Sequence, residues 1–318
     1  MGGRRPEPVV SRVAAGHIVD GRMGPMSENG APSETSVVRR ASPARQVLTL
    51  FGDYWWGVPE AMPSGALVAA MIDLGMKEPA ARATTARLTR MGLLVQDRIG
   101  RRTTHRLSER AAGIVAEEAA WLDRFGRENP EWDGLWTVLA FSIPESQRAL
   151  RHTVRSRLKW AGFAPLYDGV WISPSDSAAQ TMAQLQEAGV ESVTAMRASL
   201  ETSLPNGPQG AWDLAAAAAL YESFRAELEA ARPTTGEAEA LAERSRLMLT
   251  WQGFRGVDVG LPIELLPPGW PRVEVRRLLA VRYDGLGPLA EERMRMHVGG
   301  IAPELASAVT VRRLAGRF

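Results

Sequence analysis

The chain has 318 residues, of which 45% are hydrophobic and 23% are charged, a mixture typical of a globular protein with two or three domains. It contains no cysteine, which excludes disulfides and thiolate metal sites and fits a cytoplasmic location. The formal net charge is only +2, but residues 77–110 hold nine basic and three acidic residues, a local charge of +6 that favours an anionic partner.

The first part of the chain has the composition of a disordered segment. Residues 1–43 are rich in Gly, Pro, Ser and Arg and show no sustained periodicity, so they are predicted to form a disordered tail. This tail lacks the apolar core of a secretory signal. No apolar stretch reaches the roughly 18 residues needed to cross a bilayer, so we expect no membrane partner.

Residues 44–110 are predicted to form the first domain, which begins with three short helices. Ser42 and Pro43 are typical of a helix start, Ser64 is expected to cap the second helix, and Pro79 suits the first turn of the third. Tight breaks between short helices are typical of a helix-turn-helix.

A hairpin is predicted directly after the third helix. Strands at residues 93–95 and 103–107 flank Gly100, which permits a tight turn. A hairpin in this position makes the domain a winged helix-turn-helix. Because strand side chains alternate, His105 and Leu107 are expected to pack inward. The opposite face is expected to carry Arg102, Thr104 and Arg106.

The third helix is expected to present arginines on its exposed face. Helical spacing places Arg82, Arg87 and Arg90 there, separated by alanines that let a helix enter the major groove of DNA. Arginine can bind phosphates or read guanine through two hydrogen bonds. Taken alone, this stripe is explained equally well by a solvated basic surface. The packing face is predicted to comprise Ala81, Thr84, Thr85, Leu88 and Met91.

The hairpin adds further arginines beside this helix. Arg98, Arg101, Arg102 and Arg106 are expected to be unpaired there, where they repel one another in the absence of an anion. Near a duplex they displace condensed counterions, which stabilises binding. A basic helix next to a basic hairpin therefore predicts a surface for double-stranded DNA.

The rest of the chain is predicted to contain three further parts, which makes the fold α+β and multidomain. Residues 111–130 form a linker helix, opened by Ser108. Residues 131–205 show the order β-α-β-β-α-β of a ferredoxin-like domain. Residues 206–318 form a mostly helical C-terminal domain. The middle elements are expected at strands 136–143, 164–167, 170–173 and 193–200 and at helices 145–161 and 178–188.

A second candidate site lies in the predicted middle domain. Arg148, Arg151 and Arg155 lie on one helix, and they could hold the phosphates of an effector. Trp160 and Trp171 could line a cavity for its aromatic part. A solvated helix face or a subunit contact explains the same arginines, and this simpler interpretation is slightly favoured.

Catalytic signatures are absent from the sequence. The four histidines are scattered without the spacing of metal ligands, and no nucleophile elbow, phosphate-binding loop or dinucleotide motif occurs. We therefore expect no catalytic residues, no metal, no cofactor and no enzymatic activity.

At this point the sequence resembles the PaaX family, the phenylacetic-acid catabolic repressors of bacteria. The resemblance runs from about Ser42 to about Leu289. The stretches that carry it are "LTLFGDYWW", "ARATTARLTRMGLL", "GRRTTHRLSERA", "WDGLWTVLAFSIPESQRALRHTVRSRLKWAGFAPLYDGVWISP", "WDLAAAAALYESF" and "LPIELLPPGWP".

The resemblance implies a homodimeric transcriptional repressor that binds palindromic operator DNA and is released by an aryl-CoA thioester, typically phenylacetyl-CoA. It carries DNA-binding roles onto Arg82 and Arg87 and onto Gly100, Arg101 and Arg102. The family's middle domain also resembles CRISPR-associated endoribonucleases, which need an aspartate where the first strand ends. Here that strand ends "FSIPE", so nuclease activity is not expected.

Three departures from the family pattern leave alternatives open. Thr85 stands in the third helix where a large apolar residue is common, and Thr103, Thr104 and His105 replace aromatic residues after "GRR". The third departure precedes the segment "LPIELLPPGWP", residues 261–271, which we call the Leu-Pro connector. The stretch before it is "GFRGVDVG". Alternatives are therefore a regulator of another pathway with a different acyl-CoA effector, one with no effector, or an enzyme acting on a CoA thioester or RNA.

Overall fold

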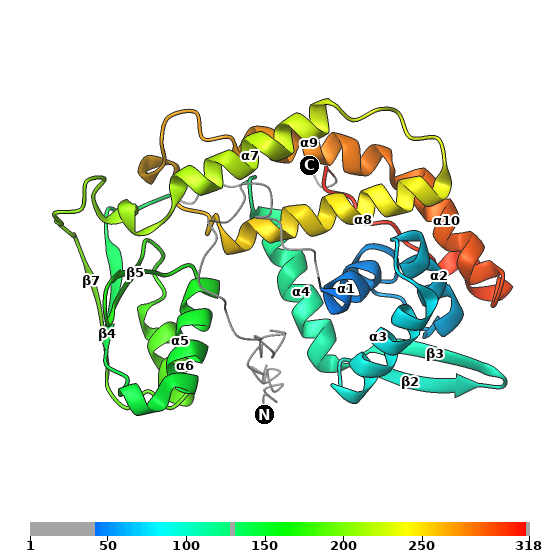
Figure 1. The fold of residues 1–318 in the computed structure, drawn as a ribbon, viewed down its shortest axis with the longest axis horizontal. Coiled ribbons are helices and arrows are strands. Elements are labelled where there is room, and N and C mark those ends of the chain that lie inside the picture. Colours follow the sequence, from blue (N-terminus) through cyan, green and yellow to red (C-terminus); the bar gives the residue numbers. More distant parts are fainter. Residues whose placement is uncertain (1–41, 128–130, 316–318) are drawn as a thin grey trace, which may run out of the picture. The chain divides into compact units, whose positions relative to one another are not determined.

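The computed structural model describes residues 42–127 and 131–315, and it contains helices and two antiparallel sheets (Figure 1). The α+β class predicted from the sequence is therefore confirmed. The predicted tail, residues 1–43, lies outside the described residues except at its end. Residues 128–130 of the predicted linker lie outside them as well.

The described residues divide into two compact units, each built from segments far apart in the sequence. The domain boundaries expected from the sequence stay a prediction, and no local sequence pattern indicates that C-terminal segments join the N-terminal helices. The first unit comprises 42–120, Gly236–Ser245 and Pro288–Arg312; the second comprises Trp121–Thr235, Arg246–Gly287 and 313–315.

Helices α1 to α3 of the first unit pack against one another, and its three strands form an antiparallel sheet in the order β1-β3-β2. The hairpin of β2 and β3 projects beyond these helices in Figure 1. The elements are α1 (Pro43–Tyr54), β1 (Met62–Pro63), α2 (Ser64–Asp73), α3 (Glu78–Arg90), β2 (Leu94–Ile99), β3 (Arg102–Leu107) and α10 (Gly287–Gly299), with parts of α4 (Glu109–Arg124) and α8 (Glu237–Gly253).

The sequence predicts a serine cap at the start of each of the first two helices, and the structure contains only the first. The Ser42 hydroxyl accepts a hydrogen bond from the backbone of Arg45 at 3.3 Å, so the predicted cap of α1 is confirmed. The predicted cap at Ser64 is wrong, because Ser64 is the first residue of α2 and its hydroxyl bonds His105 at 2.8 Å instead. The two residues before it form β1, a strand that the sequence did not predict.

The core of the first unit includes side chains from its C-terminal segments. Leu50 and Phe51 of α1 share one buried cluster with Leu241, Met294 and Val298. Fully burying a side chain of this size stabilises the fold by about 1.5–3 kcal/mol. The N-terminal helices therefore do not enclose their core alone.

The second unit contains a four-stranded sheet in the order β5-β6-β4-β7, in which all neighbours are antiparallel. The structure has the predicted order β-α-β-β-α-β. The first strand ends at Phe141 rather than Ile143 and the last at Ala198 rather than Leu200, because the ladder that these two strands share ends at the pairs Phe141–Val193 and Trp136–Ala198. The elements are β4 (Trp136–Phe141), α5 (Arg148–Trp160), β5 (Ala164–Tyr167), β6 (Val170–Ser173), α6 (Ala178–Glu187) and β7 (Val193–Ala198).

The two faces of this sheet belong to different apolar clusters. Leu139 of β4 and Trp171 of β6 pack with residues of α5 and α6 on one face. Trp136 and Ile172 point to the other face, where they cluster with Leu265. Alternation along each strand produces this division.

Two further helices of the second unit contribute side chains to a buried polar cluster. Helices α7 (Leu214–Glu229) and α9 (Arg272–Gly285) pack against each other. Asp258 forms a two-pronged ion pair with Arg272 at 2.8 Å and accepts hydrogen bonds from Tyr221 and Trp270. Burial, together with the Asp258 carboxylate, raises the pKa of Tyr221 well above its usual value, so the phenol remains a donor.

Candidate nucleic-acid interface

Helix α3 presents a basic face and buries an apolar one, as its sequence predicts. Ala81, Thr85 and Leu88 are buried, and the face with Arg82, Arg87 and Arg90 is exposed. Two expected packing residues differ from this pattern. Thr84 is only half-buried, and Met91, which follows the last helical residue, is 41% exposed. The structure thus forms the helix face proposed for DNA.

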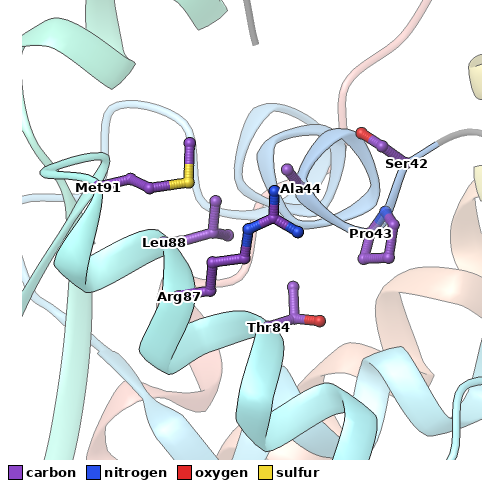
Figure 2. Close-up of a pocket in the computed structure, with 7 residues that line it drawn as sticks. All are labelled: Ser42, Pro43, Ala44, Thr84, Arg87, Leu88 and Met91. Atoms are coloured by element: carbon purple, nitrogen blue, oxygen red, sulfur yellow. The ribbon is translucent and has the colours of Figure 1, made fainter. Parts of the chain in front are cut away.

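The three arginines of α3 have different surroundings. Arg82 pairs with Glu78 one turn earlier at 2.7 Å, and its side chain stays 65% exposed. Such surface pairs contribute about 0–1 kcal/mol, so a phosphate can replace the carboxylate. Arg87 extends toward the start of α1 in Figure 2. Arg90 has no ion-pair or hydrogen-bond partner among the residues that the structure describes.

A small pocket separates α3 from the start of α1. Its volume of about 60 Å³ is enough for a few water molecules but not for an organic effector. Figure 2 shows its lining residues, Ser42, Pro43, Ala44, Thr84, Arg87, Leu88 and Met91. We therefore assign no ligand to this pocket.

The hairpin of β2 and β3 carries arginines at its tip. Gly100 has a φ of +63°, a left-handed conformation that the tight turn requires and that glycine adopts without strain. Arg98 donates to the carbonyl of Gly100 at 3.3 Å, and Arg101 has no polar partner within the described part of the chain. Ile99 is 63% exposed beside them, an apolar exposure that the sequence pattern did not predict.

The expectation that the hairpin arginines are unpaired is wrong for two of them. Arg106 pairs with Asp97 on the neighbouring strand at 3.3 Å. Arg102 pairs with Glu304 at 2.5 Å. A backbone hydrogen bond and the hydrogen bond from Arg102 lower the pKa of the Glu304 carboxyl. Asp97 belongs to the hairpin itself, whereas Glu304 lies 202 residues from Arg102 and so has no signal in the local pattern.

The inward face of the hairpin also differs in part from the prediction. His105 is buried as expected, and Leu107 is half-buried. Thr104 was expected on the outer face but is only 3% exposed, because β1 pairs with β3 and Pro63 lies opposite it. Burial lowers the pKa of His105, so the neutral form is favoured next to Ser64.

A polar cluster fixes α2 to α10 within the same unit. Arg293 donates to both carboxylate oxygens of Asp73 at 2.6 and 2.9 Å, and His297 lies 2.6 Å from one of them. Burial acts to raise the pKa of Asp73, but the hydrogen bonds from Arg293 and His297 lower it overall. Sequence reasoning missed this cluster because its members are more than 200 residues apart.

The arginines proposed for effector binding each lie near a carboxylate. Arg148 and Arg151 both pair with Glu145, and Arg155 lies 3.6 Å from Asp168. None of these arginines lines the pocket beside the start of α1 or the one beside the start of α7.

The two tryptophans of that predicted site have unlike positions. Trp171 is 3% exposed and belongs to the core between the sheet and its helices. Trp160 is 44% exposed, and the guanidinium of Arg255 lies 3.8 Å from its ring centre. Their role in effector binding stays a prediction.

The described residues contain neither a metal-ligand cluster nor a membrane-spanning helix. Across residues 42–127 and 131–315, no three His, Asp or Glu side chains are grouped as ligands for a metal ion. None of the helices described there is long and apolar enough to cross a membrane.

Comparisons with known proteins cover most of the chain. Family models match the regions 43–111 (PaaX-like protein), 129–209 (PaaX protein central Cas2-like domain) and 212–296 (PaaX-like protein C-terminal domain). The chain is 32% identical over 240 residues to the transcriptional repressor PaaX of Escherichia coli K12, which covers 71% of this chain and 74% of that protein.

A solved structure supports the fold alone. An uncharacterized protein from Mycobacterium tuberculosis matches with a TM-score of 0.52 and 20% identity, over 80% of this chain and 96% of its own. The three family models and the extent of the similarity to the Escherichia coli repressor lead to one conclusion. The chain belongs to the PaaX family.

Proposed function

We propose that the protein is a DNA-binding transcriptional repressor. The observation that carries the proposal is the joint exposure of arginines on α3 and on the β2–β3 hairpin of one compact unit. The similarity to a protein named as a transcriptional repressor supports it. A regulator of this kind acts on the chromosome, so we also propose a cytoplasmic location.

In this proposal, helices α1–α3 and the β2–β3 hairpin act as a winged helix-turn-helix. Helix α3 enters the major groove with Arg82, Arg87 and Arg90, and the hairpin arginines contact flanking phosphates or the minor groove. The sheet β5-β6-β4-β7 with α5 and α6 corresponds to a ferredoxin-like domain. Its strand order and antiparallel pairing support this assignment.

The proposed repressor is a homodimer released by a CoA thioester. Family membership supports phenylacetyl-CoA, or a related aryl-CoA, as the effector, and a phenylacetate-type operon as the target. A dimer presents two recognition helices to the half-sites of a palindrome, and a ligand that changes their spacing weakens binding. A different acyl-CoA effector, or none, is the alternative.

Titration of the full chain with the DNA upstream of its own gene tests the proposal. Fluorescence anisotropy should show binding at least about a thousand-fold tighter than to random DNA of equal length, as for specific regulators. Addition of phenylacetyl-CoA should release the DNA, whereas coenzyme A alone should not. Equal affinity for random DNA contradicts a specific repressor, and turnover of the thioester favours an enzyme.

A further inference from the structure

A further cavity lies in the second unit, outside the DNA interface and the α5 arginines described above. Its volume is about 810 Å³, within the range of about 300–1,000 Å³ typical of small-molecule sites. It lies between the start of α7 and the Leu-Pro connector that precedes α9. This size is sufficient for an organic ligand.

The walls of this cavity, which we call the connector pocket, are largely apolar. Leu265 and Leu266 line it together with two indole rings, Trp212 and Trp270. Aromatic rings supply large contact areas and faces of negative potential. The connector pocket therefore suits an apolar or aromatic ligand body.

The walls are also held in place before any ligand binds. The indole nitrogen of Trp270 donates to the buried carboxylate of Asp258 at 3.1 Å, and that carboxylate is paired with Arg272. Trp212 stacks on Trp136 with ring centres 5.9 Å apart. Two consecutive prolines in the lining, Pro267 and Pro268, restrict the connector. A preformed wall lowers the entropy lost on binding.

The charged side chains that line the connector pocket are all carboxylates. Asp213, Glu222 and Glu264 belong to the lining, and none of the described lining residues is Lys, Arg or His. Glu222 pairs with Arg225, but Glu264 has no polar partner among the described residues. The field in the connector pocket is therefore unfavourable for an anion.

The start of α7 does not offset this field. A free helix N-terminus attracts anions through its unpaired N–H groups. Here Asp213 caps the helix, and its carboxylate accepts the backbone N–H of Ala216 at 3.0 Å. The lining thus contains no cationic side chain for the phosphates of a CoA thioester, and its side-chain donors are the neutral groups of Asn206, Gln209 and the two tryptophans.

From these observations we infer that the connector pocket binds an organic amine, a small cation with an aromatic or aliphatic body. The body packs against the apolar wall, and the charged nitrogen lies near Glu264 and over an indole face. This site is distinct from the DNA interface, and it carries no role for the arginines of α5.

The test uses two probes of matched size and opposite charge, 1-naphthylmethylammonium and 1-naphthylacetate. Isothermal titration calorimetry of the full chain without DNA should show the ammonium binding about ten-fold more tightly than the carboxylate. Equal or tighter binding of 1-naphthylacetate, or no binding of either probe, overturns the inference. Because DNA is absent, this result is independent of the proposed repressor function.

Matched variants locate the binding. Ala218→Trp fills the connector pocket and should abolish binding of the ammonium, whereas Ala219→Trp, which changes an exposed neighbour outside the lining, should not. Glu264→Gln alters only an exposed side chain and should reduce the charge preference, while Glu229→Gln on α7 should leave it unchanged. Unaltered preference in Glu264→Gln shows that the ammonium binds elsewhere and contradicts the proposal.

Discussion

Arg102 of β3 and Glu304, 202 residues further along the chain, form an ion pair at 2.5 Å within one compact unit. Their side chains remain 42% and 60% exposed, so solvent screens the pair and it contributes little to stability. A DNA phosphate must replace this carboxylate if Arg102 is to bind DNA. In the proposed DNA interface, the C-terminal segment would therefore compete with DNA for one arginine of the hairpin.

Glu304→Gln should increase DNA affinity. The substitution releases Arg102 and removes one negative charge from the neighbourhood of the duplex, so we expect about a two- to five-fold lower Kd at low salt. Fluorescence anisotropy at two salt concentrations measures the effect, which should decrease as salt increases. Glu292→Gln, an exposed carboxylate of α10, changes the net charge equally and should have a smaller effect. Equal effects of both variants contradict a specific competition.

Arg101→Ala should weaken DNA binding more than Arg102→Ala. Arg101 has no polar partner among the described residues and gives up no ion pair when it binds a phosphate, whereas Arg102 must leave Glu304. Loss of one phosphate contact should reduce the slope of log K against log salt by about one. Lys159→Ala in α5 removes the same charge and should leave the slope unchanged. A reversed order of the two hairpin variants argues against this account.

Asp73→Asn should lower the free energy of unfolding by about 1–3 kcal/mol near neutral pH, because Arg293 and His297 lose a partly buried partner. The folded-state pKa of Asp73 is lowered, so its contribution is present above the unfolded pKa of about 4 and lost as pH falls through the folded value. Urea denaturation should therefore show a flatter acid limb in Asp73→Asn than in Glu292→Gln. Parallel acid limbs rule out this role.

His105→Gln should flatten the stability profile in a different pH range. Burial lowers the pKa of His105, so stability is complete above the unfolded pKa of about 6.5 and decreases as pH falls below it. A charged ring also needs a partner for its second nitrogen, which is buried without one in the described structure. Urea denaturation from pH 7 to pH 5 measures the change. His152→Gln, which changes an exposed side chain of α5, is the control and should retain the wild-type dependence of stability on pH.

Trp160 and Trp171, which the sequence predicts to line an effector cavity, should respond differently to substitution. Trp171→Ala removes a core indole and should lower the free energy of unfolding by about 3–5 kcal/mol. Trp160→Ala affects a half-exposed ring beside Arg255 and should change it by less than about 1.5 kcal/mol. Thermal denaturation separates them, and a similar loss in both variants contradicts the assigned core.

Local signals predicted much of the fold. Asp168 and Gly169 form the turn between β5 and β6, and both strands have the predicted bounds because this dipeptide favours a tight hairpin turn. The buried and exposed faces of α3 follow from helical spacing in the same way. Elements whose stability depends on neighbours in sequence are therefore readable from sequence.

The parts that the sequence could not predict depend on distant partners. The strand β1 has only two residues and exists because β3 pairs with it, and this pairing buries Thr104. Glu304 reaches Arg102, and Arg293 reaches Asp73, through the folded C-terminal segment. Periodic patterns in the sequence do not predict such long-range contacts. The connector pocket was missed for the same reason, since its walls come from two separate segments.

The central claim, that α3 is the main DNA-reading element, is tested most directly by comparing two arginine variants. One carries Arg82→Ala, Arg87→Ala and Arg90→Ala on α3, and the other carries Arg148→Ala and Arg155→Ala on α5. We expect the α3 variant to bind the upstream DNA about a hundred-fold or more weakly than wild type in an anisotropy titration. The α5 variant should remain within about three-fold of wild type. Full affinity in a correctly folded α3 variant contradicts the account.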